Sequence, residues 1–235
     1  MSGHSKWSTI KRQKATSDAR RSNLFTKLAN AVTLAARAGG DPAMNFQLRL
    51  ALERAHAANM PKDSVERAIK RGTGKGGERR VEEITYEIYG PAGTAILVET
   101  VTDNKNRTSA EVKATLNKFG GKMAGGGAVS YLFERKGLIK VAGAEGEETE
   151  LKIIDSGADD YEPVEGGYLV YVAAEKLKLV KDALESSGLK VESSELAYEP
   201  KSPVAVAELE AEKVVKLLEA LDELDEVVTV SSNLG

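Results

Sequence analysis

Cationic, hydroxyl and aromatic side chains alternate at the start of the chain, a pattern suited to binding a polyanion. Six of the nineteen residues from Gly3 to Arg21 are Lys or Arg, and one is acidic. Lys and Arg neutralise phosphates, hydroxyls add hydrogen bonds, and Trp7 can stack on an unpaired base. The alternative for Trp7 is to anchor this arm against the helices that follow. The arm residues that we predict to contact nucleic acid are His4, Lys6, Trp7, Lys11, Arg12, Lys14, Arg20 and Arg21.

Two further groups of cations have the spacing of a binding site. Arg67, Lys70 and Arg71 are three and four residues apart, and so share one face of a predicted helix. We interpret them as a phosphate track beside the arm, although such a face is often only solvated. Lys105 and Arg107 stand at the predicted start of another helix, where free N–H groups and the helix dipole also favour anions. The alternative there is a turn with solvated cations.

The charge of the chain is segregated along its length. Residues 1–80 hold 17 Lys and Arg against 6 Asp and Glu, a net charge of +11. Residues 81–235 hold 16 basic and 30 acidic residues, a net charge of −14, and the whole chain carries −3. A strongly positive region attracts polyanions, while an acidic remainder repels them. The alternative is that the two parts neutralise each other across an interface.

Side chains suited to catalysis or metal binding are scarce. The chain has no Cys and two His, and no pair of them has the spacing of a zinc or metalloprotease motif. The run Gly72–Gly77 matches G-x-G-x-x-G by its letters, but it follows a predicted helix rather than a strand. We therefore interpret it as a hinge between domains. We predict that the protein is not an enzyme and that it uses no metal and no cofactor.

The chain also lacks the features of a secreted or membrane protein. No stretch approaches the roughly 20 apolar residues that span a bilayer, and the start of the sequence has no apolar run typical of a secretory signal. The absence of Cys fits a reducing compartment. We predict a cytoplasmic protein that does not bind membranes and that is a monomer.

The first 80 residues predict a small helical bundle. Apolar residues recur at helical spacing from Leu24 to Ala35, and Gly39–Gly40 ends that helix. Asp41–Pro42 predicts the cap and first turn of a second helix. A third helix begins after Asn59 and ends at Gly72. Residues 1–80 are therefore expected to form a basic helical domain with an N-terminal arm.

Beyond Val81 the pattern changes to a mixture of strands and helices. Strands are predicted at 83–90, 93–101 and 128–133, with a helix over 107–119 between the second and third. Residues 135–199 have the β-α-β-β-α-β order of a ferredoxin-like fold. The remaining helix and strand in 200–235 complete the first set. We predict an α+β multidomain chain with a helical bundle and two ferredoxin-like α/β sandwiches, in which 135–199 is inserted into a discontinuous domain formed by 81–134 and 200–235.

Several of these segments resemble the YebC/PmpR family. The resemblance is carried by "GHSKWSTIKRQKATSDARRSNLFTKL", by "YEIYGPAGTAILVETVTDNKNRTSAEV" and by "AVSYLF", and it is colinear with the whole chain. It implies three domains, a helical one followed by two α/β ones. It also implies a transcriptional regulator that binds DNA. A mitochondrial relative is a translational activator of cytochrome oxidase subunit one, and bacterial relatives are linked to ribosomes and to relief of stalling on proline-rich stretches.

Residue patterns and resemblance together indicate a non-enzymatic, nucleic-acid-binding regulator of gene expression. The target is DNA or a ribosomal or transfer RNA. No predicted helix carries the Arg, Asn and Gln cluster expected to read a major groove, which favours RNA. A ribosome-associated translation factor is the first alternative, and a protein-interaction module whose basic end docks on an acidic protein is the second. The role of the glycine-rich loop 120–127 stays open between close approach to a ligand and a flexible connection.

Overall fold

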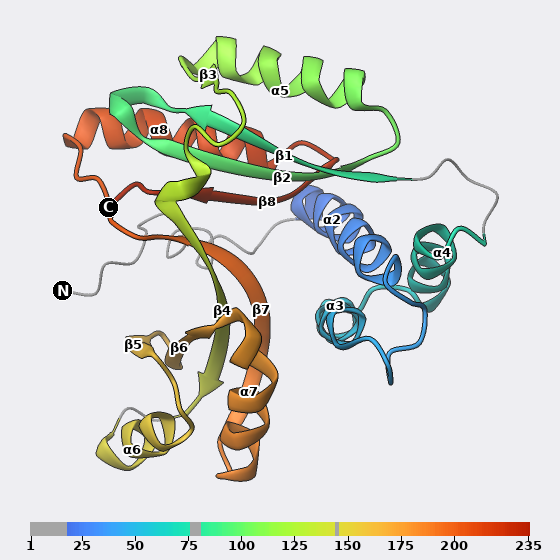
Figure 1. The fold of residues 1–235 in the computed structure, drawn as a ribbon, viewed down its shortest axis with the longest axis vertical. Helices are drawn as coiled ribbons and strands as arrows, with labels where there is room; N and C mark the ends of the chain where they lie inside the picture. Colours follow the sequence, from blue (N-terminus) through green and yellow to red (C-terminus); the bar gives the residue numbers. More distant parts are fainter. Residues whose placement is uncertain (1–17, 76–80, 144–145) are drawn as a thin grey trace. The chain divides into compact units, whose positions relative to one another are not determined.

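The computed structural model describes residues 18–75, 81–143 and 146–235, with side chains from residue 24 onward (Figure 1). Contacts divide these residues into two compact units. One holds Glu134–Tyr198, and the other holds the described residues up to Phe133 together with Glu199–Gly235. The sequence pattern predicts that the first 80 residues form a domain of their own, and that finer division stays a prediction. No helix in the described ranges is long and apolar enough to cross a membrane.

Three helices begin the larger unit: α2 (Asp18–Ala36), α3 (Phe46–Ala57) and α4 (Lys62–Gly72). The predicted helical bundle is confirmed for these residues, because apolar side chains from all three helices meet in one core. Its fully or almost fully buried members include Val32, Ala36, Leu48, Ala55, Val65 and Ala68.

The predicted cap of α3 is wrong. Asp41 accepts a hydrogen bond from the Ala43 N–H and forms a turn instead, and α3 begins at Phe46 with Asn45 as its N-cap. The Asn45 carboxamide oxygen accepts the Leu48 N–H at 3.1 Å. A buried Asn in this position satisfies helix ends on both sides. Its side-chain nitrogen donates to the carbonyl oxygens of Ala35 and Gly39.

Gly72 allows α4 to approach α2 closely. A Cβ at this position would lie 2.2 Å from the Thr33 carbonyl oxygen and 2.7 Å from the Ala36 Cβ. The Thr33 hydroxyl donates to the Ala68 carbonyl oxygen at 3.2 Å across the same contact. The first glycine of the G-x-G-x-x-G run therefore packs two helices together. This agrees with rejecting the run as a phosphate-binding loop, while its last two glycines lie outside the described residues.

A four-stranded sheet in the order β3-β1-β2-β8 completes the larger unit. Its strands are β1 (Glu82–Tyr89), β2 (Ala95–Thr102), β3 (Lys122–Met123) and β8 (Val227–Ser232), with a short 3-10 turn at Pro91–Gly93. Helices α5 (Lys105–Phe119) and α8 (Glu208–Asp222) pack on this sheet (Figure 1). The shared core contains Ile88, Val98, Val112, Leu116, Val214 and Leu217.

The smaller unit contains a second four-stranded sheet, in the order β5-β6-β4-β7. Its elements follow the predicted β-α-β-β-α-β order along the chain. They are β4 (Phe133–Ala142), α6 (Glu147–Asp155), β5 (Asp160–Val164), β6 (Gly167–Ala173), a 3-10 turn (Ala174–Lys176), α7 (Leu177–Ser186) and β7 (Lys190–Pro200). The mixed α/β class with two four-stranded antiparallel sheets is therefore confirmed, whereas the assignment to ferredoxin-like sandwiches is a finer statement that stays a proposal.

The strand predicted over Ala128–Phe133 is wrong. The third strand of the first sheet is the two-residue β3, and Ser130–Leu132 forms a 3-10 turn before β4 begins. A strand needs its backbone N–H groups for a ladder. Here the Val129 and Ser130 N–H groups donate instead to the carboxylate of Glu87.

Candidate nucleic-acid interface

Most of the predicted arm lies outside the described residues. This holds for His4, Lys6, Trp7, Lys11, Arg12 and Lys14. Arg20 and Arg21 lie in the first turn of α2, but only their backbone is described. The geometry of a nucleic-acid interface can therefore be followed on α4 and at the start of α5.

Two cations on α4 face solvent together. Arg67 and Lys70 are both exposed, and they lie three residues apart, so they share one side of the helix. The Arg67 guanidinium folds back along its own helix, donating to the Asp63 carbonyl oxygen at 3.3 Å and to the Ser64 hydroxyl at 3.1 Å. Neither of these two acceptors is a carboxylate, so the contacts leave the positive charge of Arg67 at the surface.

Arg71 differs from its two neighbours. Its side chain is half-buried, and it interacts with other groups of the protein. The inward side of α4 carries Val65 and Ala68, which are buried in the helical core. The structure therefore brings Arg67 and Lys70 together at the surface and turns Arg71 partly toward the protein.

The surroundings of α4 are cationic. Residues 18–75 contain 11 Lys and Arg against 5 Asp and Glu, a net charge of +6. One exposed pair, Lys62 with Glu66 at 3.9 Å, is neutralised within α4 itself. An excess of this size in a small region produces a positive potential that attracts phosphates.

The cations at the start of α5 have acidic partners. Asn104 caps the helix by accepting the Arg107 N–H. The Arg107 guanidinium binds Asp103 at 3.0 Å and also binds Glu226. The hydrogen bond and the negative charge of Glu226 raise the pKa of the Arg107 guanidinium. Lys105 lies 3.7 Å from a Glu82 carboxylate oxygen. An anion would have to compete with these carboxylates, and the predicted contacts of Lys105 and Arg107 with nucleic acid stay predictions.

Glu226 is a residue that the sequence analysis missed. Its carboxylate accepts hydrogen bonds from both Arg107 and the Thr108 hydroxyl, so it joins the start of β8 to the first turn of α5. It lies 118 residues from Thr108 along the chain. Local spacing therefore gave no indication of this contact.

Glu87 is the second residue that the sequence analysis missed. Its carboxylate accepts the N–H groups of Gly127, Val129 and Ser130 at 2.6, 2.7 and 2.8 Å. Burial by itself would raise the pKa of Glu87, but the three backbone hydrogen bonds outweigh this effect and hold the pKa below its usual value. The glycine-rich loop is thus fixed at its C-terminal end by an ionised side chain on β1, rather than being only a flexible connection.

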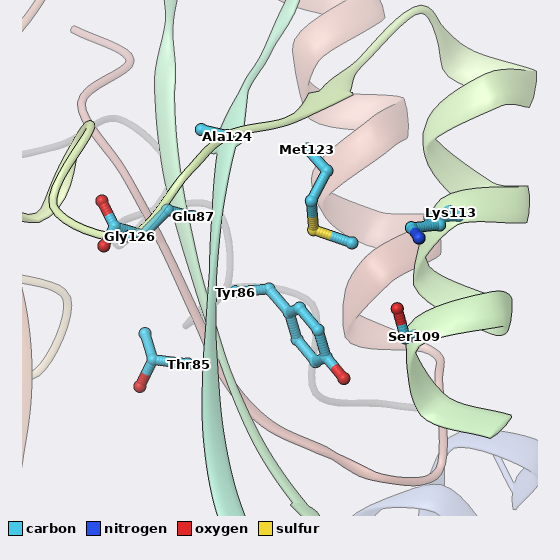
Figure 2. Close-up of a pocket in the computed structure, with 8 residues that line it drawn as sticks. All are labelled: Thr85, Tyr86, Glu87, Ser109, Lys113, Met123, Ala124 and Gly126. Carbon is cyan, nitrogen blue, oxygen red and sulfur yellow. The ribbon is translucent and has the colours of Figure 1, made fainter. Parts of the chain in front are cut away.

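A small cavity adjoins this loop. Its volume is ≈ 200 Å³, below the roughly 300–1,000 Å³ of typical small-molecule sites. Figure 2 shows that α5 and β3 contribute side chains on one side of β1, and the loop lies on the other. No cluster of three or more metal-ligating side chains occurs in the described part of the chain. The lining residues are Thr85, Tyr86, Glu87, Ser109, Lys113, Met123, Ala124 and Gly126.

The fold and these charges define a class of protein: a mixed α/β chain with two four-stranded sheets and a cationic helical region at its N-terminal end. Residues 5–75 match the family model described as "TACO1/YebC protein N-terminal domain". Residues 81–234 match the model described as "TACO1/YebC second and third domain". The chain belongs to the TACO1/YebC family, which confirms the resemblance drawn from its sequence.

Similar proteins are named as regulators. A protein of Chloroflexus aggregans is 47% identical over 240 residues, covering 100% of this chain and 95% of its own length. A protein of Acidithiobacillus ferrooxidans is 49% identical over 235 residues, covering 99% of this chain and 94% of its own length. Each is named "Probable transcriptional regulatory protein". The crystal structure of a conserved hypothetical protein from Aquifex aeolicus is similar with a TM-score of 0.89 and 44% identity, covering 98% of this chain and 97% of that one.

Proposed function

We propose that this protein is a non-enzymatic regulator of gene expression that binds nucleic acid through its first 80 residues. The observation that carries the proposal is the separation of charge, +11 over residues 1–80 against −14 over the remainder. The names of the relatives support the role of a transcriptional regulator. The cationic region supplies the attraction to phosphate, and the acidic remainder limits binding to that region.

The side chains on the bundle favour contact with the phosphate backbone over reading of bases. The exposed side of α4 mixes Lys62, Asp63, Glu66, Arg67 and Lys70. It offers no Asn or Gln for a bidentate contact with adenine, and two of its five groups are acidic. A surface of this kind recognises charge and shape rather than a base sequence.

This composition supports a second candidate, a ribosome-associated translation factor that binds ribosomal or transfer RNA. Structured RNA is recognised mainly through its shape, its phosphates and its 2′-hydroxyls, which suits a cationic surface without base-reading side chains. A protein-interaction module remains the third possibility. It would replace the nucleic acid with an acidic protein surface as the partner of the basic region.

The remaining parts of the proposal follow from the sequence. We keep the division into a helical domain (1–80), a discontinuous α/β domain (81–134 and 200–235) and an inserted ferredoxin-like domain (135–199) as a proposal. The protein is proposed to act in the cytoplasm as a monomer, with no metal and no cofactor. The arm and α4 carry the phosphate contacts, while the two sheet-containing parts orient them.

The test measures binding of the full chain to a mixed-sequence DNA duplex, to a ribosomal RNA hairpin and to purified 70S ribosomes. We expect the affinity for nucleic acid to fall steeply between about 50 and 200 mM salt. Simultaneous replacement of Lys11, Arg12 and Lys14 by Ala should lower the slope of log affinity against log salt concentration by up to about 3. Replacement of Lys176 and Lys178 by Ala, which removes charge from the smaller unit, is the control.

The three probes separate the candidates. A defined duplex that resists excess competitor DNA supports the transcriptional regulator, whereas sedimentation with ribosomes that the triple variant loses supports the translation factor. Binding that does not change with salt, or a chain that binds none of the three probes, would overturn the proposal.

A further inference from the structure

The outer edge of β1 is only partly covered by a neighbouring strand. β1 pairs with β2 over its whole length, from Glu82 to Tyr89. On its other side, the described ladder pairs only Ile88 and Tyr89 with β3. One further hydrogen bond, from the Ala124 N–H to the Glu87 carbonyl oxygen at 2.8 Å, ends this ladder. The chain then leaves the sheet as the glycine-rich loop.

The pleat decides which backbone groups point toward this open edge. In an antiparallel sheet, the N–H and C=O groups of alternate residues point to the same neighbour. The backbone C=O group of Glu87 points to the β3 side, because it accepts the Ala124 N–H. The backbone groups of Thr85 and Glu83 therefore point to that side as well. Ile84 points the other way, because its carbonyl oxygen accepts the Thr100 hydroxyl from β2. The main-chain groups of Glu83 and Thr85 therefore stand along the line in which β3 would continue.

The cavity next to the loop lies on that same line. Its lining includes three consecutive residues, Thr85, Tyr86 and Glu87. Side chains of consecutive strand residues point to opposite faces of a sheet, so a cavity that touches all three lies at the edge rather than over one face. Figure 2 shows this arrangement, with Tyr86 directed toward α5 and Thr85 and Glu87 on the other side of β1. A volume of ≈ 200 Å³ is on the scale of a single side chain rather than of a cofactor.

The Tyr86 hydroxyl provides an independent observation. Its oxygen is buried and has no hydrogen-bond partner in the described part of the chain. Burial, together with the negative charge of Glu226, raises the pKa of Tyr86, so the hydroxyl keeps its proton and can donate. Buried polar groups are rarely left without a partner, and this hydroxyl belongs to a residue that lines the cavity.

We propose that the β1 edge binds an extended peptide segment of another protein by strand addition, along the line of β3. The peptide backbone exchanges hydrogen bonds with Thr85 and Glu83, as β-augmentation requires. One short hydroxyl-bearing side chain of the peptide, such as that of threonine, enters the cavity beside Tyr86 and Met123, where its oxygen accepts a hydrogen bond from the Tyr86 hydroxyl. A basic residue stands opposite the exposed carboxylate of Glu83, where cross-strand charge pairs are favourable.

The same carboxylate argues against a second copy of this chain as the occupant. Two β1 edges paired with each other would place acidic residues close to acidic residues, and like charges on neighbouring strands are unfavourable. This inference goes beyond the proposed function, because it concerns a peptide and a part of the chain outside the cationic region.

The probe is a capped synthetic peptide in which lysine and threonine alternate over about six residues. Its matched control has the same sequence and charge but carries N-methyl groups on the amides that would face β1, which removes the hydrogen bonds of strand addition. We expect the unmodified peptide to bind the full chain with a Kd tighter than about 1 mM and to shift the backbone amide resonances of Glu83 and Thr85. The N-methylated peptide should bind about tenfold more weakly or worse.

The matched protein variants are Thr85→Pro and Thr85→Ala. Proline at an edge position whose N–H faces outward leaves the pairing with β2 intact, so Thr85→Pro should fold and should weaken peptide binding about tenfold or more. Thr85→Ala keeps the N–H group and should bind within about threefold of the original chain. The proposal fails if the peptide does not bind below about 1 mM, or if the N-methylated peptide binds as tightly as the unmodified one.

Discussion

The helical region and the first sheet use charged side chains in opposite ways. On α4, Arg67 and Lys70 remain exposed at the surface of a region with net charge +6. Around the sheet, two charged groups are engaged within the protein: Arg107 binds two carboxylates, and Glu87 binds three backbone N–H groups. The first arrangement leaves charge for a partner, while the second uses charge to hold the fold together.

This difference shows that residue type and helix position do not decide which cations are free to bind phosphate. Arg107 lies at a helix N-terminus, which favours a bound anion. The carboxylate of Glu226, 119 residues away in the sequence, already binds Arg107 there. Lys70 stands in the last turn of α4, where the helix dipole favours a cation but supplies no anion. Acidic neighbours contributed by the folded chain make the distinction.

Charge reversal on α4 should produce the largest effect. Replacing Arg67 and Lys70 together by Glu changes the net charge of residues 18–75 from +6 to +2. We expect the affinity of the full chain for a DNA duplex or an RNA hairpin to fall about a hundredfold at low salt, and the log–log salt slope to fall by about 2. Fluorescence anisotropy over a salt series measures both.

A matched pair on the smaller unit controls for the change in total charge. Lys176 and Lys178 are exposed there, and replacing both by Glu alters the net charge of the chain by the same amount. This control should weaken binding by less than about threefold. An α4 variant that retains both its affinity and its salt slope would remove α4 from the interface.

Removal of the Glu87 carboxylate should give the next largest effect. Glu87→Ala leaves three backbone N–H groups of the loop without their acceptor, and we expect it to lower the free energy of unfolding by about 2 kcal/mol. Denaturant unfolding of the full chain measures this loss. Glu83→Ala, on the same face of β1 four residues earlier, is the control and should change stability by less than about 0.5 kcal/mol.

The loss of stability caused by Glu87→Ala should become smaller at low pH. The pKa of Glu87 is lower in the folded chain than in the unfolded chain. Its stabilising contribution is therefore complete above the unfolded value of about 4.3 and is lost as pH falls through the folded value. The difference between the original chain and Glu87→Ala should be constant near neutral pH and should shrink below about pH 4. A difference that grows as the pH falls would contradict this assignment.

The sequence predicts the repetitive parts of this protein well and its long-range polar contacts poorly. The helical periodicity from Leu24 to Ala35, which lies within α2, and the alternating strand β1 follow from apolar periodicity, which is local. The loop at 124–130 does not, because the groups that shape it are backbone N–H donors whose acceptor, Glu87, is about 40 residues away. The predicted strand at Ala128–Phe133 had suitable residue types but lost its donors to that carboxylate.

The same reasoning applies to the candidate site. The phosphate track on α4 was drawn from helical spacing, which correctly places Arg67 and Lys70 on one side of the helix. Spacing could not show that Arg71 is half-buried. It could not show that Glu226 and Glu82 lie beside the cations of α5 either, since both contacts depend on how distant strands meet that helix.

Neutralising Glu226 should make the positive charge at the start of α5 more available to an anion, as it is on α4. In Glu226→Gln, Arg107 keeps Asp103 but loses the carboxylate that raises its pKa. We expect nucleic-acid affinity to rise about twofold to fivefold, as for an anion gaining a helix N-terminus, and Tm to fall by about 2–4 °C because α5 loses a link to β8. Glu212→Gln, at an exposed position on α8, should change neither quantity. An unchanged affinity together with the expected fall in Tm would mean that Asp103 alone keeps anions away.

The smallest effect is expected at Lys105, and it provides the sharpest test of the comparison. Lys105 and Lys70 are both exposed lysines on helices, but Lys105 lies 3.7 Å from a carboxylate oxygen of Glu82. An exposed ion pair of this kind contributes little, so Lys105→Ala should change the free energy of unfolding by less than about 0.5 kcal/mol. Because Glu82 competes with an anion for Lys105, this substitution should lower the salt slope of nucleic-acid binding by much less than 1, whereas Lys70→Ala should lower that slope by about 1. Since each substitution removes one positive charge from the chain, equal slopes in the two variants would mean that total charge governs binding, and the exposed cations of α4 would then have no special role.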